Sequence, residues 1–359
     1  MLTETLRQDG HRNPRTRPTH VSFMPPFILE HMANSESYPP ELRTAARRTL
    51  RYTKVFQRRA DSLSAAKLRF PAPHLDRLVF STRSGESDIR KEGQVASSNV
   101  SIDECYDGFG ATFKLYYDIF MRNSIDDSGE QLVGHVRDSS PFNNALWDGC
   151  SMVFGEGDGH YFNRFTSLDI IGHELTHGII SYTCNLDYRG QSGALNESLA
   201  DVFGSMVKQY HLKQTAVDAD WLIGQGLFTA QVHGTALRSM KVPGTAYDDP
   251  TIGKDPQPSD MQNYVHTEDD WGGVHINSGI PNHAFYIIAT ALGGYSWERA
   301  GQIWYATVCD TRLPQNADFN LFAWLTVHNA VKLYGKYVGD LVASTWRRVG
   351  VEPSQAAAY

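Results

Sequence analysis

The segment His173-Glu174-Leu175-Thr176-His177 is the strongest constraint on how this 359-residue chain can fold. In a helix the two histidines lie one turn apart on the same face, so both imidazoles can bind one zinc ion. Glu174 lies beside them and is suited to act as general base on a metal-bound water. The flanking residues 169–172 and 178–180 are mostly apolar, which indicates a buried segment. Because polar side chains are costly there, a metal site explains them better than a surface helix with incidental histidines.

A catalytic zinc site needs a third protein ligand and one open coordination position. The metzincin pattern would place a glycine and a histidine at positions 180 and 183, but this chain has Ile180 and Thr183. The other common solution is a glutamate on the following helix, and Glu197 lies 20 residues after His177. That spacing allows a loop and a returning helix. Glu197 is therefore predicted to complete a site for one zinc ion per chain.

Two polar residues near Glu197 are suited to hold the histidine ligands. Asp201 lies four residues further on, on the same helical face, and can accept the spare N–H of one histidine. Asn196 can hold the other. Alone, the pattern Asn-Glu-x-x-x-Asp is typical of a capped surface helix. Its position after the histidine pair favours the metal interpretation.

Together these motifs resemble the thermolysin family of zinc metalloendopeptidases, over residues 79–351. The resemblance implies that Asn144 and Ala145 lie on an edge strand that pairs with the substrate backbone, and that Arg238 contacts a substrate carbonyl. It also implies an apolar pocket on the leaving-group side of the scissile bond, lined by Phe162, Phe165, Ile170, Ile223 and Leu237. Cleavage is therefore expected on the N-terminal side of bulky apolar residues.

The resemblance also supplies the remaining groups that peptide hydrolysis needs. It implies that Tyr188 and His275 hydrogen-bond the developing oxyanion, and that Asp270 orients His275. Taken singly, such a tyrosine is typical of packing and such a histidine of a turn. Glu174 would take a proton from the zinc-bound water and pass it to the leaving amine. Hydrogen bonds at the developing charge would contribute about 3 kcal/mol each.

The chain departs from the family at its double calcium site. The five acidic positions correspond here to Asp169, Lys208, Asp220, Leu222 and Gln225. Three of the five are not carboxylates, and a hard cation needs several oxygen ligands, so the site is expected to be lost. Lys208 is predicted to pair with Asp169 and Asp220 in place of the ion, although a solvated lysine is the alternative.

Residues 1–77 differ from the rest of the chain and are predicted to form a propeptide. Between residues 41 and 70, nine Lys or Arg stand against two Asp or Glu, whereas the whole chain carries a net charge of −7. A basic run can bind nucleic acid or membrane, but an acidic partner within the chain fits better. Pro25-Pro26-Phe27-Ile28-Leu29 resembles a motif in the short propeptides of protealysin-like members. Pro25, Pro26 and Phe27 are predicted to dock in the cleft; a disordered tail is the alternative.

Composition indicates a soluble protein, with 41% hydrophobic and 20% charged residues. The negative charge argues against nucleic acid as a partner, and no apolar run reaches the roughly 18 residues of a membrane span. The first twenty residues lack the apolar core of a signal peptide. We therefore expect synthesis in the cytoplasm, with any export by a route that needs no such signal. No cysteine precedes Cys105, which excludes a cysteine-switch propeptide.

The expected fold is α+β, with residues 78–180 as a β-rich lobe that includes the zinc helix and residues 181–359 as a helical lobe. Apolar residues between positions 102 and 120 recur at helical spacing, and residues 130–165 are rich in strand formers. A zinc-binding protein without activity would lack Glu174, Tyr188 or His275. A gluzincin aminopeptidase would need an acidic cluster for the substrate's free amine, and no GAMEN-like segment precedes the zinc motif.

Overall fold

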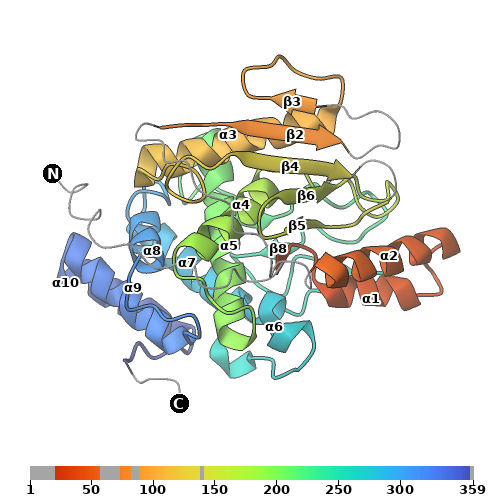
Figure 1. The fold of residues 1–359 in the computed structure, drawn as a ribbon. Helices are drawn as coiled ribbons and strands as arrows, with labels where there is room; N and C mark the ends of the chain where they lie inside the picture. Colours follow the sequence, from red (N-terminus) through yellow and green to blue (C-terminus); the bar gives the residue numbers. More distant parts are fainter. Residues whose placement is uncertain (1–20, 57–72, 82–88, 138–140, 356–359) are drawn as a thin grey trace.

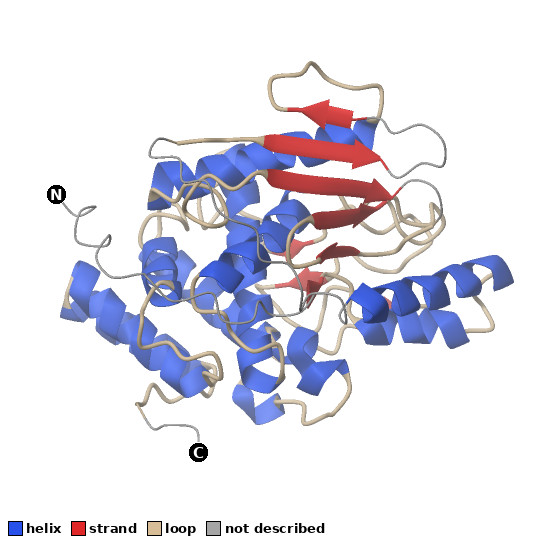
Figure 2. Ribbon diagram, viewed as in Figure 1, coloured by secondary structure: helices blue, strands red, loops and turns tan. Residues whose placement is uncertain are grey.

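The computed structural model describes residues 21–56, 73–81, 89–137 and 141–355. Its strands gather in one region and its helices surround them and fill the remainder (Figure 1, Figure 2). The main sheet has the strand order β1-β5-β6-β4-β2-β3. These strands are β1 Val21–Ser22, β2 Arg77–Ser81, β3 Ile89–Lys91, β4 Leu132–Arg137, β5 Ala145–Trp147 and β6 Met152–Gly155. The sheet is mixed, because β2, β4 and β6 run parallel whereas β1, β3 and β5 pair antiparallel with their neighbours.

One helix, α3 (Val100–Phe120), contacts strands β2 and β4 of this sheet. It is the helix that the apolar periodicity predicts, and its buried residues include Ile102, Cys105 and Phe109. The side chain of Asn99 caps its first turn by accepting hydrogen bonds from the backbone N–H groups of Ser101 and Ile102.

Two helices that pack closely form the centre of the molecule. They are α4 (Leu168–Tyr182) and α5 (Gly190–Leu212). A Cβ atom at Gly204 would lie 2.4 Å from the carbonyl oxygen of Asp169, and one at Gly172 would lie 3.0 Å from the Cα of Gly204. The two glycines thus allow the backbones to approach closely, which brings the ligand-bearing faces of α4 and α5 together.

The C-terminal half is mainly helical, as predicted. Its helices are α6 Asp270–Asn277, α7 Gly279–Leu292, α8 Ala300–Val308, α9 Phe319–Tyr334 and α10 Lys336–Arg348. Trp304 and Trp346 stack at a centroid distance of 6.0 Å and anchor α10 to α8. The segment between β8 (Arg238–Ser239) and α6 holds short elements: the two-residue strands β9 Asp248–Asp249 and β10 Gly253–Lys254, and a 3-10 turn over Met261–Asn263. A further short strand, β7 (Leu222–Ile223), pairs with β8.

The N-terminal segment contributes a helical hairpin beside the body (Figure 1). It consists of α1 (Pro26–Asn34) and α2 (Pro40–Phe56), which contact each other. The predicted basic helical run continues to residue 70, but residues 57–72 lie outside the described part of the chain. The predicted boundary after residue 77 falls inside β2. Among the described helices, none is long and apolar enough to cross a membrane.

Candidate metal centre and active site

Three buried side chains from the two central helices form a cluster that can hold a metal ion. His173 and His177 lie one turn apart on α4, and Glu197 faces them from α5. One ligand atom from each lies within 4.8 Å of the others. The two histidine Nε2 atoms are 2.9 Å apart, and Glu197 Oε2 is 3.4 Å from His173 Nε2. The structure thus brings the three predicted ligands together.

The chemistry of this cluster fits zinc, with two imidazole nitrogens, one carboxylate and room for a fourth ligand. Glu197 Oε2 is buried and has no hydrogen-bond partner among the described residues, which is costly unless a cation binds it. Burial lowers the pKa of His177 to about 3. Burial also opposes charge on His173, but the hydrogen bond to Asp201 and the nearby charge of Glu197 raise the pKa of His173 to about 9.

Each histidine ligand is hydrogen-bonded through its Nδ1 atom to a side chain of α5. His173 Nδ1 donates to Asp201 Oδ1 at 2.8 Å, and His177 Nδ1 donates to Asn196 Oδ1 at 2.9 Å. These bonds fix the tautomers so that both Nε2 atoms face the metal position, as the sequence predicts. Burial opposes ionisation of Asp201, but the charge of Arg238 and the hydrogen bond from His173 lower the pKa of Asp201 to about 2.

Glu174 lies in the same buried region and is not one of the clustered ligands. Neither of its carboxylate oxygens has a hydrogen-bond partner among the described residues. Burial is the main cause that raises the pKa of Glu174 to about 8. A carboxylate with an elevated pKa accepts a proton readily at neutral pH, which is the property of a general base.

Tyr188 and His275 approach the cluster beside Glu197. Tyr188 Oη lies 2.5 Å from Glu197 Oε1 and 3.3 Å from His275 Nε2. His275 Nδ1 donates to Asp270 Oδ1 at 2.6 Å. Burial opposes charge on His275, but Asp270 and Glu197 raise its pKa to about 9.

Helix α6 bends at Trp271, Gly272 and Gly273, which have left-handed backbone angles. The two glycines adopt them without steric cost, and the bend places Asp270 against His275.

The backbone of the N-terminal segment crosses this site. Phe23 N–H donates to the carbonyl oxygen of Ala145 at 3.0 Å, and Met24 N–H donates to Asn144 Oδ1 at 2.9 Å. Arg238 Nη1 donates to the carbonyl oxygen of Phe23 at 3.1 Å. His275 Nε2 donates to the carbonyl oxygen of Ser22 at 2.6 Å. Asn144, Ala145 and Arg238, predicted to bind a substrate backbone, thus bind residues 22–24 of the same chain.

The side chain of Phe23 enters the apolar region predicted as the leaving-side pocket. Its ring packs edge-on against His173 at a centroid distance of 5.1 Å and against Phe165 at 6.4 Å. The Arg238 guanidinium lies 4.5 Å from the ring centroid. Phe23 and the predicted lining residues are all buried in one hydrophobic cluster, including Phe162, Phe165, Ile170, Ile223 and Leu237.

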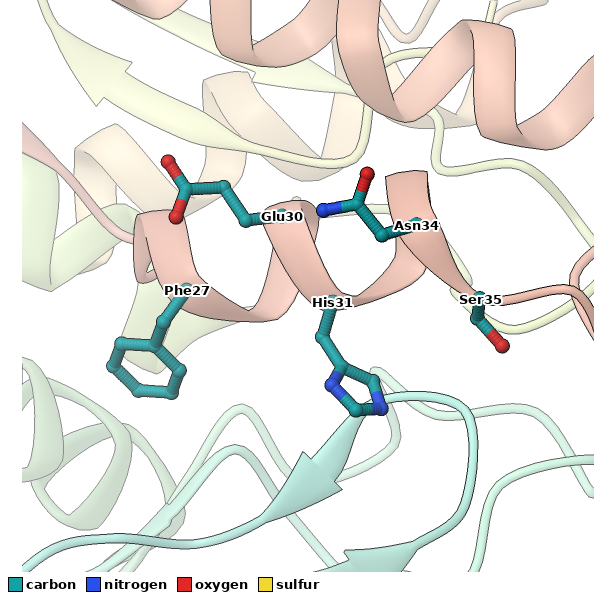
Figure 3. A pocket seen from close by; sticks show the side chains of 5 residues that line it. All are labelled: Phe27, Glu30, His31, Asn34 and Ser35. Atoms are coloured by element: carbon teal, nitrogen blue, oxygen red, sulfur yellow. The ribbon is translucent and has the colours of Figure 1, made fainter.

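The predicted docking residues Pro25, Pro26 and Phe27 directly follow Met24, whose N–H is bound by Asn144. Pro25 caps α1 and Pro26 occupies its first position, where a fixed φ and a missing N–H are tolerated. Phe27 is half-buried on α1 and lines an open surface pocket (Figure 3). Just before these residues, the Ser22 carbonyl contacts His275 and the Phe23 ring contacts His173. The prediction centred on the two prolines at the start of α1, whereas Phe23, the apolar residue that enters the site, precedes them.

Sequence reasoning missed a second contact between the N-terminal segment and the body. Tyr38 Oη donates a hydrogen bond to Asp158 Oδ2, which also accepts from Asn143 Nδ2 at 2.8 Å. Further along the segment, Asn144 Nδ2 donates to Thr53 Oγ1 at 3.2 Å. The neighbouring residue on α2, Tyr52, packs edge-on against Phe142 and belongs to a small apolar cluster with Leu146 of β5. Helix α2 thus lies beside the strand that binds Phe23.

The position carried over from the calcium site is held by a lysine. Lys208 Nζ lies 2.9 Å from Asp220 Oδ1 and 3.5 Å from Asp169 Oδ2, and it donates to the carbonyl oxygen of Leu222 at 2.7 Å. Asp169 is 1% exposed, so the lysine supplies the countercharge that a buried carboxylate needs. The predicted pairing of Lys208 with both aspartates is present.

A His-His-Glu cluster with a neighbouring unpaired glutamate, at the junction of a β-rich and a helical lobe, defines a zinc metallopeptidase. The chain belongs to the thermolysin family. Residues 79–181 match the family model of the thermolysin metallopeptidase catalytic domain, and residues 184–351 match that of its alpha-helical domain. The predicted family, the predicted α+β fold and the predicted zinc dependence are confirmed.

Similar proteins include two curated proteases and one solved structure. An extracellular metalloprotease of Pectobacterium carotovorum subsp. carotovorum is 48% identical, covering 95% of this chain and 99% of the relative. Protease PrtS of a Photorhabdus species is 42% identical, covering 93% and 92%. The precursor of protealysin from Serratia proteamaculans has 46% identity and a TM-score of 0.84, covering 92% of this chain and 99% of the other. The chain is thus a protealysin-like zinc endopeptidase that acts on peptide substrates, and the alternatives are not favoured.

Proposed function

We propose that Glu174, Tyr188 and His275 carry the hydrolysis. A bound zinc ion supplies Lewis acidity to the substrate carbonyl and to a water molecule. Glu174 takes a proton from the attacking water and delivers it to the leaving nitrogen. Tyr188 and His275 donate hydrogen bonds to the oxygen on which negative charge develops, and Asp270 keeps His275 oriented. The support is their convergence beside Glu197, with Tyr188 Oη and His275 Nε2 3.3 Å apart.

Substrates are held as an added strand on β5, with a bulky apolar side chain after the scissile bond. Asn144 and Ala145 bind backbone N–H groups, and Arg238 binds a backbone carbonyl. The pocket residues supply an apolar surface on the leaving side, and burying one large side chain there stabilises the complex by about 1.5–3 kcal/mol. The support is the bound segment: Phe23 contacts Ala145, Arg238 and the pocket, and the Met24 N–H donates to Asn144.

Residues ahead of β2 form an inhibitory prosegment. The observation that carries this proposal is the occupation of the site by residues 22–24, which leaves no room for another peptide on the same hydrogen-bonding groups. We place excision between Arg59 and Val79, and ahead of β2, because Arg77 is held in the body by Glu92 at 2.6 Å. Residues 57–72 of that interval lie outside the described part of the chain.

The inhibitory role is tested with freshly purified wild type and Glu174→Ala. Wild type should gain activity on an external peptide as mass spectrometry records its shortening, whereas Glu174→Ala should remain full length. Full activity in wild-type protein that still begins at Met1 would rule out inhibition by the prosegment.

We also propose that the double calcium site is replaced by the Lys208 ion pairs and that the enzyme is exported. The first rests on the ammonium lying between Asp169 and Asp220. The second rests on relatives named as extracellular proteases.

A further inference from the structure

We propose that the prosegment is bound as a substrate and does more than block the site. The protein hydrolyses its own Ser22–Phe23 peptide bond. This inference rests on the proposed roles of Glu174, Tyr188 and His275. It goes further, because it names one bond of this chain that is held in the reacting position and predicts a defined product, a chain that begins at Phe23.

The hydrogen bonds fix which peptide bond faces the metal cluster. The Ser22 carbonyl accepts from His275 Nε2 at 2.6 Å, and the same nitrogen lies 3.7 Å from the ligand oxygen Glu197 Oε2. The next backbone groups face other partners, since Phe23 N–H donates to Ala145 and the Phe23 carbonyl accepts from Arg238. Ser22 is therefore the residue whose carbonyl lies at the donor His275, and Phe23 would supply the leaving nitrogen.

The side chain after this bond agrees with the same register. Phe23 is fully buried, and its ring contacts His173 and Phe165. A shift by one residue would place Ser22 or Met24 at the pocket, because successive side chains of a strand point to opposite faces. The pocket contact and the four backbone hydrogen bonds therefore specify one alignment.

The reaction balances with one water molecule. The water oxygen adds to the carbonyl carbon of Ser22, and Glu174, whose carboxylate oxygens have no partner among the described residues, takes a proton. The C–N bond breaks as that proton passes to the nitrogen of Phe23. The water's second proton also passes to this nitrogen, so the products are a carboxylate at Ser22 and an ammonium group at Phe23, and no oxidant or further reactant is needed.

The cut releases only part of the inhibitor. Phe23 and Met24 keep their bonds to Arg238 and Asn144, and the following helices keep the contacts of Tyr38 and Thr53. Val21 and Ser22 keep their pairing with β5, but they lose the peptide bond that joins them to these anchors. The Ser22–Phe23 cut is thus an early event that frees one side of the site, and removal of α1 and α2 follows.

The test follows full-length zinc-loaded protein by mass spectrometry and N-terminal sequencing. Wild type should yield a chain that begins at Phe23, with first-order kinetics that do not depend on protein concentration. Phe23→Asp should slow this cut about ten- to hundredfold, because a charge replaces the apolar group in the pocket. Phe23→Leu should retain it. Tyr337→Asp is the matched control, since Tyr337 lies on α10 and is 82% exposed, and it should change the rate less than about twofold.

An active wild type that never yields the Phe23 terminus would overturn the proposal. So would a rate that rises with protein concentration, which would mean cutting between molecules, or the same product from Glu174→Ala. Failure to cleave any peptide, external or internal, would instead count against the proposed function.

The register has a second readout that does not use the reaction. In zinc-free full-length Glu174→Ala, the amide hydrogens of Phe23 and Met24 should exchange slowly, because both are bonded to the β5 segment. Phe23→Asp in that background should speed their exchange at least about tenfold, and Tyr337→Asp should not. Rapid exchange of these two amides in the parent protein would overturn the docked alignment.

Discussion

Asp201 holds His173 on the side of the imidazole that faces away from the metal position, with 2.8 Å between Oδ1 and Nδ1. The same carboxylate accepts two hydrogen bonds from Arg238, at 2.8 Å each, and one from Asn282 Nδ2 at 2.9 Å. Because Arg238 also binds the Phe23 carbonyl, one buried carboxylate connects a metal ligand to the group that holds the bound peptide. The metal site and the peptide site are therefore connected through the hydrogen bonds of Asp201.

Asp201→Asn should weaken zinc binding about ten- to hundredfold, since it removes the charge that orients His173 and balances Arg238. Competition with a chelator of known affinity measures the change. Asp248→Asn, at an exposed carboxylate on β9, is the control and should bind zinc as wild type does. Equal zinc affinity in Asp201→Asn and wild type would contradict the orienting role.

Glu174→Ala should keep one zinc ion per chain and lose peptidase activity by at least about a hundredfold. The three ligands remain in place, whereas the group that accepts the water's proton is gone. Elemental analysis gives the zinc content, and hydrolysis of a fluorogenic peptide gives the rate. Near-normal activity in a zinc-loaded variant would mean that another residue is the base.

Peptides with Phe or Leu after the scissile bond should be cleaved about ten- to hundredfold faster than those with Asp or Lys there. The pocket around Phe162, Phe165 and Leu237 is buried and apolar, so a charge entering it loses solvation without gaining a partner. A peptide library analysed by mass spectrometry reads the preference directly. Preference for a charged residue would contradict the pocket assignment.

Lys208→Met should lower the free energy of unfolding by about 3 kcal/mol, because it leaves buried Asp169 without its countercharge. Lys336→Met is the matched control: its partner Asp340 and Lys336 itself are exposed, so the cost should be at most about 1 kcal/mol. Both are measured by thermal unfolding. Excess EGTA should leave the melting temperature of wild type unchanged, and a large decrease would show that calcium is bound after all.

Much of this site could be predicted because its chemistry leaves short, ordered signals. The spacing of His173 and His177 places two ligands on one helical face, and the position of Glu197 supplies the third. Lys208 could be paired with Asp169 and Asp220 because the resemblance to the family places all three at positions of the calcium site. The helix over residues 100–120 followed from its apolar period, since a long periodic segment is a strong local signal.

The parts that could not be predicted depend on contacts between distant segments. The strand pairing of Val21 with Trp147 joins residues far apart in sequence, and no local pattern specifies it. Tyr38 and Asp158 meet only once α1 has docked. Phe23 was overlooked because two prolines nearby give a stronger local signal, although they only begin a helix.

The most direct test of the account is peptide hydrolysis by matured, purified protein with and without 1,10-phenanthroline, alongside zinc analysis of the same samples. We expect one zinc ion per chain, hydrolysis that stops when the chelator removes it, and recovery when zinc is restored. Undiminished hydrolysis by protein shown to be free of zinc would contradict the claim that His173, His177 and Glu197 form a catalytic metal centre.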